Sequence, residues 1–323
     1  MEIDLWMSYG TPGARIRRER TARGIPDDLH DGLSPAQGGH AGCLTASLRT
    51  APTKTGPQPY DPPMAPSTLA FLGGNGHCAA RLSAARAYLP ARIDLVAVPY
   101  PGFEGRPRAA DLEGFLTAVA DHLVSTGPDL VYATGIGGLL ALCLRARGAL
   151  AGIPILMQGP VLWGLEKRMM PRIMRKTTRL APMQWALSRM FATAVFQRRF
   201  VRKYFTRRPD DEILTAFFAG YAECTALPDF FAWLTPDLLR SLETELARRP
   251  AALAGIRIWW GGRDAVVSPR ELEWTVSALG SVSESVARWP VRVFPDWGHY
   301  PMIDAPAEWA QELAVALAST EAV

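Results

Sequence analysis

Short apolar runs alternate with longer amphipathic stretches over most of this sequence, beginning near residue 67. Six runs have the length and character of strands: Thr68–Leu72, Ile93–Val98, Leu130–Ala133, Ile153–Gln158, Ile256–Trp260 and Val291–Phe294. Such continuous apolar runs are typical of strands that are buried on both faces of a parallel sheet. Because helical patterns separate most of the runs, we predict an α/β fold with a mostly parallel central sheet flanked by helices.

The helical pattern is clearest between residues 111 and 126. Its apolar positions recur at the spacing of one helix face: Leu112, Phe115, Leu116, Val119 and Leu123. His122 lies beside this face, and we interpret it as a surface histidine. The same reasoning predicts two further helices, over Ala79–Leu89 and Gly135–Arg147.

Two regions depart from the alternating pattern. Residues 1–66 are rich in Gly, Pro, Ser, Thr and Arg and lack any sustained periodicity, so we predict a disordered N-terminal extension. Met64 stands just before the first strand, and an alternative interpretation is that translation starts there. We predict that residues 67–323 form one domain, with helices inserted between later strands at about 160–250.

The composition is that of a globular protein, with 48% apolar and 20% charged residues. No apolar window is long enough to span a membrane and no secretory signal pattern is visible, so we expect a cytoplasmic protein. The cysteines (Cys43, Cys78, Cys143, Cys224) show no zinc-type spacing, so we expect free thiols and neither a metal nor a cofactor. The modest net charge of +4 gives no reason to expect nucleic acid as a partner.

Three motifs follow predicted strands in a defined order. They are the tight turn Ala133–Gly138, the segment Trp260–Asp264 and the segment Trp297–His299. Together with Val98–Gly102 and Gly298–Pro306, they resemble the α/β-hydrolase superfamily in its thioesterase and lactonase-like branches. The resemblance runs from about residue 67 to residue 317, and it implies an α/β-hydrolase fold with an inserted lid.

The resemblance also implies roles for individual residues. In the family, a G-x-S-x-G turn presents a nucleophilic serine, and an acid and then a histidine follow later in the chain. Asp264 and His299 match the acid and base positions, whereas Gly135 stands where the serine belongs. By the same resemblance, the backbone N–H groups of Ile136 and Asn75 would stabilise an oxyanion. The loop that carries Asn75 can also be interpreted as a simple tight turn.

Other candidate groups are less suited to this chemistry. Thr134 precedes Gly135 by one residue, and a shift of one residue on a tight turn directs its side chain away from the histidine. The adjacent His77 and Cys78 are poorly placed for proton transfer to each other, so we expect Cys78 to pack inward. Asp296 and Asp304 flank the histidine, and we interpret them as solvated turn and cap residues.

The missing nucleophile leaves two hypotheses. In the first, His299, oriented by Asp264, is the general base in hydrolysis of an apolar ester, lactone or thioester, or in a biosynthetic cyclisation or elimination. In the second, the protein is a pseudoenzyme that binds a ligand or a protein partner, and Gly135 relieves the strain of a turn that no longer carries a nucleophile. We favour the enzyme, because an inactive pocket has no chemical need for both Asp264 and His299.

The predicted lid is strongly basic. Between Glu166 and Arg208 the sequence has thirteen Lys or Arg residues and a single acidic residue. The interleaved methionine and aromatic residues suit a long apolar or polycyclic substrate. The charge is compatible with a solvated helix face, with docking of an acyl carrier protein or a coenzyme A thioester, and with contact with an anionic membrane surface.

Overall fold

The computed structural model describes residues 66–160, 163–164, 186, 189–190, 193–222, 224–282 and 290–319. Contacts divide the chain into Met1–Pro63 and Met64–Val323, and all described residues lie in the second unit. The predicted N-terminal extension therefore lies outside the described residues, apart from Pro66.

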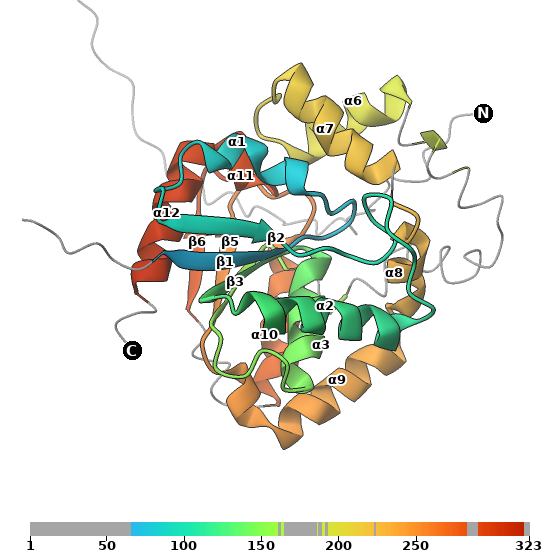
Figure 1. Cartoon of the computed structure of the whole chain (residues 1–323), viewed down its shortest axis with the longest axis vertical. Helices are drawn as coiled ribbons and strands as arrows, with labels where there is room; N and C mark the ends of the chain where they lie inside the picture. Colours follow the sequence, from blue (N-terminus) through green and yellow to red (C-terminus); the bar gives the residue numbers. More distant parts are fainter. Residues whose placement is uncertain are drawn as a thin grey trace, which may run out of the picture. The chain divides into compact units, whose positions relative to one another are not determined.

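Six strands form one sheet (Figure 1). They are β1 (Ser67–Leu72), β2 (Ile93–Ala97), β3 (Leu130–Thr134), β4 (Ile155–Gln158), β5 (Ile256–Gly261) and β6 (Val291–Phe294). Their order is β2-β1-β3-β4-β5-β6, and every neighbouring pair is parallel, which confirms the predicted parallel sheet. Because the strands are parallel, the loops that follow them gather at one edge of the sheet, where ligands bind in open α/β folds.

Helices cover both faces of this sheet, as predicted (Figure 1). One face carries α1 (Ser83–Arg86), α11 (Pro301–Asp304) and α12 (Pro306–Ala318). The other carries α2 (Leu112–Thr126), α3 (Ile136–Ala146) and α10 (Pro269–Gly280). Helix α2 starts after Asp111, whose carboxylate accepts a hydrogen bond from the N–H of Gly114 at 2.8 Å. Four of its five predicted apolar-face residues are buried.

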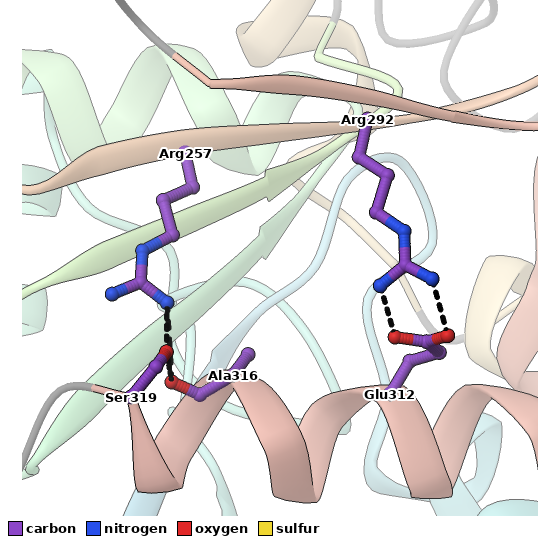
Figure 2. Close-up of polar contacts among 5 residues, drawn as sticks. All are labelled: Arg257, Arg292, Glu312, Ala316 and Ser319. Carbon is purple, nitrogen blue, oxygen red and sulfur yellow. Dashed lines mark hydrogen bonds and ion pairs between the residues drawn. The ribbon is translucent and has the colours of Figure 1, made fainter.

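Two strand arginines hold α12 against the sheet (Figure 2). Arg292 of β6 makes a bidentate ion pair with Glu312, and its Nη2–Oε1 distance is 2.6 Å. Arg257 of β5 donates to the carbonyl of Ala316 at 3.2 Å and to the hydroxyl of Ser319 at 2.5 Å. Because these arginine contacts are partly exposed to solvent, they contribute little to the free energy of folding and mainly fix the position of α12.

Two predicted elements differ from the structure. Val291 to Val293 are exposed and only Phe294 of β6 is buried, so the prediction of a strand buried on both faces is wrong there. β6 is an edge strand, paired among the described strands only with β5, and such strands commonly keep residues in contact with solvent.

The predicted helix Ala79–Leu89 is a 3-10 turn, η1 (Ala79–Leu82), followed by the short α1. Pro90 disfavours helical backbone just before it, which limits how far the helix extends.

Among the described residues between β4 and β5, four helices and a 3-10 turn are found, and they are called the inserted helices below. They are α6 (Ala194–Tyr204), α7 (Asp211–Ala222), α8 (Leu227–Trp233), α9 (Pro236–Arg248) and η3 (Pro250–Leu253). In α6 the side chain of Phe200 is buried against Phe217 of α7, while Arg198, Arg199 and Arg202 are exposed. Residues 165–185, which include six of the thirteen basic residues, lie outside the described residues. No described helix is both long and apolar enough to cross a membrane.

Candidate active site

A sharp turn joins β3 to α3, and Gly135 occupies it. The backbone of Gly135 has φ 55° and ψ −122°, a conformation that side-chain-bearing residues rarely adopt. The helix that follows approaches the end of β1 very closely, because a Cβ on Gly137 would lie 2.1 Å from the carbonyl oxygen of Leu72. Together these glycines let the chain form the strand, sharp turn and helix in which the family presents its nucleophile. Thr134 belongs to β3 itself and is buried.

Asp264 and His299 lie together at the same edge of the sheet, although 35 residues separate them in sequence. His299 Nδ1 is 2.8 Å from Asp264 Oδ2, and both residues are buried. The other carboxylate oxygen accepts hydrogen bonds from the N–H groups of Val266 at 2.7 Å and Val267 at 3.0 Å. Because an ionised carboxylate can only accept, the proton of His299 resides on Nδ1 and Nε2 is left as the basic atom. No described residue is hydrogen-bonded to that Nε2.

The glycine-rich loop after β1 lies against the Gly135 turn. A Cβ on Gly74 would be 3.1 Å from the carbonyl oxygen of Thr134 and 3.3 Å from the backbone nitrogen of Ile136. Within the described part of the chain, neither the N–H of Ile136 nor that of Asn75 donates to another protein group. No acceptor from the described residues therefore occupies the two backbone donors that the resemblance indicates.

Gly159, which directly follows β4, is a site residue that the sequence analysis missed. A Cβ at this position would lie 2.9 Å from Asp264 Oδ2 and 3.4 Å from His299 Nδ1. The absence of a side chain here makes room for the acid–base pair. Its only sequence signal is a glycine at the end of a predicted strand, which many turns share.

His77 has a structural role instead of a catalytic one. Its Nδ1 accepts the N–H of Gly73 at 3.1 Å, so its Nε2 donates to the carbonyl of Val98 at 2.7 Å. Burial lowers the pKa of His77 to about 4, which keeps the ring neutral. Cys78 is buried, in agreement with its predicted inward packing. The described cysteines, which exclude residue 43, are free thiols.

The inserted helices reach the base through α6. The ring of Tyr204, the last residue of α6, meets the His299 ring edge-on, with centroids 5.9 Å apart. Just beyond the helix, the N–H of Thr206 donates to Asp304 Oδ2 at 3.1 Å. Asp304 Oδ1 is buried without a hydrogen-bond partner among the described residues, so the interpretation of this residue as a solvated cap is wrong, and burial raises its pKa to about 6. Asp296, in contrast, is exposed and paired with Arg263 at 2.7 Å, as a solvated turn residue would be.

The arrangement offers a histidine base, a fixed carboxylate and two backbone donors, with glycine at the turn. Such a set can activate a water molecule and stabilise an oxyanion without forming an acyl-enzyme. No cluster of three or more His, Cys, Asp or Glu residues suited to a metal ion occurs among the described residues.

A family model described as "Alpha/beta hydrolase family" matches residues 69–312. No curated protein matches the sequence. Among solved structures, a protein from Burkholderia cenocepacia provisionally described as an aryl esterase is 16% identical, with a TM-score of 0.60, over 80% of this chain and 92% of that one.

Two further solved structures share the fold, with similarly low sequence identity. A bacterial membrane phospholipase A is 20% identical, with a TM-score of 0.55, over 80% of each chain. A loop variant of a haloalkane dehalogenase from Bradyrhizobium elkanii is 18% identical, with a TM-score of 0.52, over 79% of this chain and 90% of that one. At these identities the likeness establishes the architecture and leaves the chemistry to the residues of this chain.

Proposed function

The chain belongs to the alpha/beta hydrolase family, and from that premise we propose that it hydrolyses an apolar ester, lactone or thioester without a serine nucleophile. His299 is the general base, Asp264 orients it, and the backbone N–H groups of Ile136 and Asn75 form the oxyanion site. Gly135 occupies the position of the family's nucleophile.

The reaction follows from the available groups. His299 Nε2 removes a proton from a water molecule while the water oxygen bonds to the acyl carbon. The carbonyl oxygen becomes an oxyanion, which accepts hydrogen bonds from Ile136 and Asn75. The intermediate then collapses, the bond from the acyl carbon to the leaving oxygen or sulfur breaks, and the proton on Nε2 passes to the leaving group. The products are a carboxylic acid and an alcohol or thiol, and no covalent enzyme intermediate forms.

One observation carries this proposal most directly: the buried Asp264–His299 pair is completely oriented. The two N–H groups that bind Asp264 Oδ1 leave Oδ2 for Nδ1 of His299. An aspartate so placed fixes the tautomer of the histidine and stabilises its protonated form. General-base catalysis contributes about 10²–10⁴-fold, and loss of one oxyanion donor costs about 10²–10³-fold. Useful rates are therefore attainable without a nucleophile.

The substrate class rests on the residues that surround the base. Tyr204 and Tyr300 both pack their rings against His299, with centroid distances of 5.9 Å and 4.7 Å. Aromatic walls favour an apolar acyl chain or ring system. The inserted helices that supply Tyr204 would act as the lid, and the thioesterase or lactonase-like branch is the specific assignment that we propose. The same base could serve a cyclisation or an elimination.

The second candidate is a pseudoenzyme that binds a ligand or a protein partner. Gly135 favours it, because a glycine adopts the strained turn without cost and supplies no nucleophile. Such a protein would bind its ligand equally well after His299 is replaced.

The basic residues of the inserted helices offer a partner surface. A groove of about 880 Å³ between α6 and α7 combines Arg198, Arg202 and Arg208 with Val201, Leu214 and Phe218. We propose that an acidic acyl carrier protein or the phosphates of a coenzyme A thioester bind there, with an anionic membrane surface as the alternative. The charge-reversed variant Arg198→Glu/Arg202→Glu should then lose activity on acyl carrier protein or coenzyme A substrates while retaining activity on simple thioesters.

The experiment that tests the function is turnover of acyl thioesters, lactones and activated esters by the wild type, His299→Ala and Asp264→Asn. We expect both variants to lose about 10²–10⁴-fold in kcat. His122→Ala is the matched control, because this histidine lies on α2 and makes no contact with the pair. Equal turnover by His299→Ala and the wild type would contradict the proposal, and absence of turnover with retained ligand binding would favour the pseudoenzyme.

A further inference from the structure

Arg81 is the feature that the proposed mechanism leaves unused. It lies in η1, directly after the glycine-rich loop, and only 2% of its surface is exposed. Its guanidinium carbon lies 4.3 Å from the ring centroid of Phe217, 5.0 Å from that of Tyr221 and 5.2 Å from that of Tyr300. Aromatic faces attract a cation, but they accept none of its N–H groups in conventional hydrogen bonds.

Two of the donor nitrogens of Arg81 are unsatisfied within the described part of the chain. Its Nε and Nη2 are buried and have no hydrogen-bond acceptor, and the ion pairs there do not include this residue. Among the described residues, the hydroxyl of Tyr221 is hydrogen-bonded to the guanidinium. Burying an arginine without an opposite charge is unfavourable, so the arrangement calls for an explanation.

Other arginines of this protein show what usually satisfies the group. Arg145, also buried, donates Nη2 to the carbonyl oxygens of Ile153 and Ala254. Arg292 binds both carboxylate oxygens of Glu312 (Figure 2). Arg81 has the donors for such a pair but lacks the carboxylate.

The two unpartnered nitrogens define the missing ligand. Nε–H and one N–H of Nη2 point to the same side of the planar guanidinium, at a spacing that matches the two oxygens of a carboxylate. A buried bidentate pair of this kind is directional, and it selects for a planar anion over a neutral group of the same size.

Nε and Nη2 of Arg81, called the fork below, lie close to the candidate active site. A Cβ on Gly76 would lie 2.8 Å from Arg81 Nη2, so the fork faces the glycine-rich loop whose N–H groups are candidate oxyanion donors. Tyr300, which contacts the guanidinium, directly follows His299 and packs against its ring. Phe217 and Tyr221, which pack on the guanidinium, both belong to α7.

We propose that Arg81 binds a carboxylate of the substrate through Nε and Nη2, so that the substrate is an ester, lactone or thioester with a second, ionised carboxyl group. This inference rests on the proposed function for the ester linkage, but the binding step does not depend on turnover. Arg81 is then a specificity-determining residue, and Phe217, Tyr221 and Tyr300 hold its guanidinium in place.

Binding is measured by titration calorimetry with the monomethyl and dimethyl esters of succinate, glutarate, adipate and suberate. The protein carries His299→Ala, so that hydrolysis does not interfere. We expect the monomethyl ester of the fitting length to bind about 10- to 100-fold more tightly than its dimethyl ester, and Arg81→Met to abolish this preference. Arg81→Lys keeps the positive charge but lacks the paired N–H donors of the guanidinium. It should therefore retain only part of the preference for the monomethyl ester.

A matched control and a stability readout separate recognition from a structural role. Arg86→Met, in the neighbouring α1, should leave the preference unchanged. Arg81→Met should melt at or above the wild-type temperature because it removes an unpaired buried charge, whereas Arg145→Met, which leaves carbonyls without donors, should melt lower. A large loss of stability in Arg81→Met would assign a structural role to Arg81 and overturn the proposal.

The remaining outcomes are equally decisive. Equal binding of monomethyl and dimethyl esters, no binding of any monomethyl ester, or an unchanged preference in Arg81→Met would overturn the carboxylate site. Methyl phosphate binding in place of the hemi-esters would do the same. Turnover of neutral esters without a carboxylate preference would leave the proposed hydrolysis intact, while carboxylate binding without any turnover would leave the site intact and refute the hydrolysis.

Discussion

Replacement of Gly135 by serine tests both the strain and the geometry of the turn. At φ 55° and ψ −122° a residue with a Cβ is held in a sparsely populated conformation, which costs about 1–3 kcal/mol. For a domain of this size, each kcal/mol corresponds to about 2–4 °C in melting temperature. We therefore expect Gly135→Ser to melt about 2–12 °C below the wild type.

The same substitution supplies the missing nucleophile. If His299 is placed as the family's base, the new hydroxyl should be acylated by an activated ester, and the assay should show a burst equal to the enzyme concentration. Mass spectrometry of the quenched protein should then show one acyl group on residue 135.

Gly135→Ala is the matched control for this experiment, because it adds the same Cβ without a hydroxyl. It should melt at the same temperature as Gly135→Ser and form no acyl-enzyme. The reasoning about strain would be refuted if both variants melted within about 1 °C of the wild type. A folded Gly135→Ser protein with no adduct would refute the assignment of residue 135 to the nucleophile position.

Three further substitutions test other parts of the account. Gly159→Ala should displace the carboxylate of Asp264, and kcat should fall at least about tenfold in a steady-state assay; an unchanged kcat would mean that the pair tolerates the added methyl group. Gly137→Ala should lower the melting temperature more than Gly135→Ala, since its Cβ would meet the carbonyl of Leu72 at 2.1 Å; equal melting of the two would contradict the close approach of α3. His77 has a pKa lowered to about 4, so its contribution to the free energy of unfolding is complete above pH 6.5 and is lost as the pH falls from 6.5 towards 4. Denaturant titrations should show His77→Phe to be less pH-dependent than the wild type over this interval, and a parallel dependence would exclude His77 as the source.

The sheet could be predicted from sequence because its strands are continuous apolar runs separated by helical patterns. Helix α2 has two features that are visible in sequence, an apolar face and the N-terminal cap residue Asp111. The exposure of β6 could not be predicted in this way, because its four residues look like a buried strand until the sheet order places them at the edge. Edge position depends on which strands pair, and a local pattern does not encode that choice.

The candidate site likewise contains some residues that the sequence indicated and others that it did not. Asp264 and His299 were identifiable because each stands in a short motif after a strand, and the structure brings them to 2.8 Å. Gly159 and Arg81 carried no such motif. Their roles depend on contacts between elements far apart in the chain, as when Arg81 of η1 meets aromatic rings of α7. Such residues look ordinary in sequence, and only packing reveals what they touch.

The most direct test of the central claim is turnover of the substrate panel combined with intact-mass analysis at steady state, for the wild type and His299→Ala. We predict hydrolysis by the wild type with no acyl group on the protein, and loss of at least about 10²-fold in kcat in His299→Ala. An acylated wild-type protein, on Thr134 or any other residue, or full activity without His299 would contradict base-catalysed attack by water.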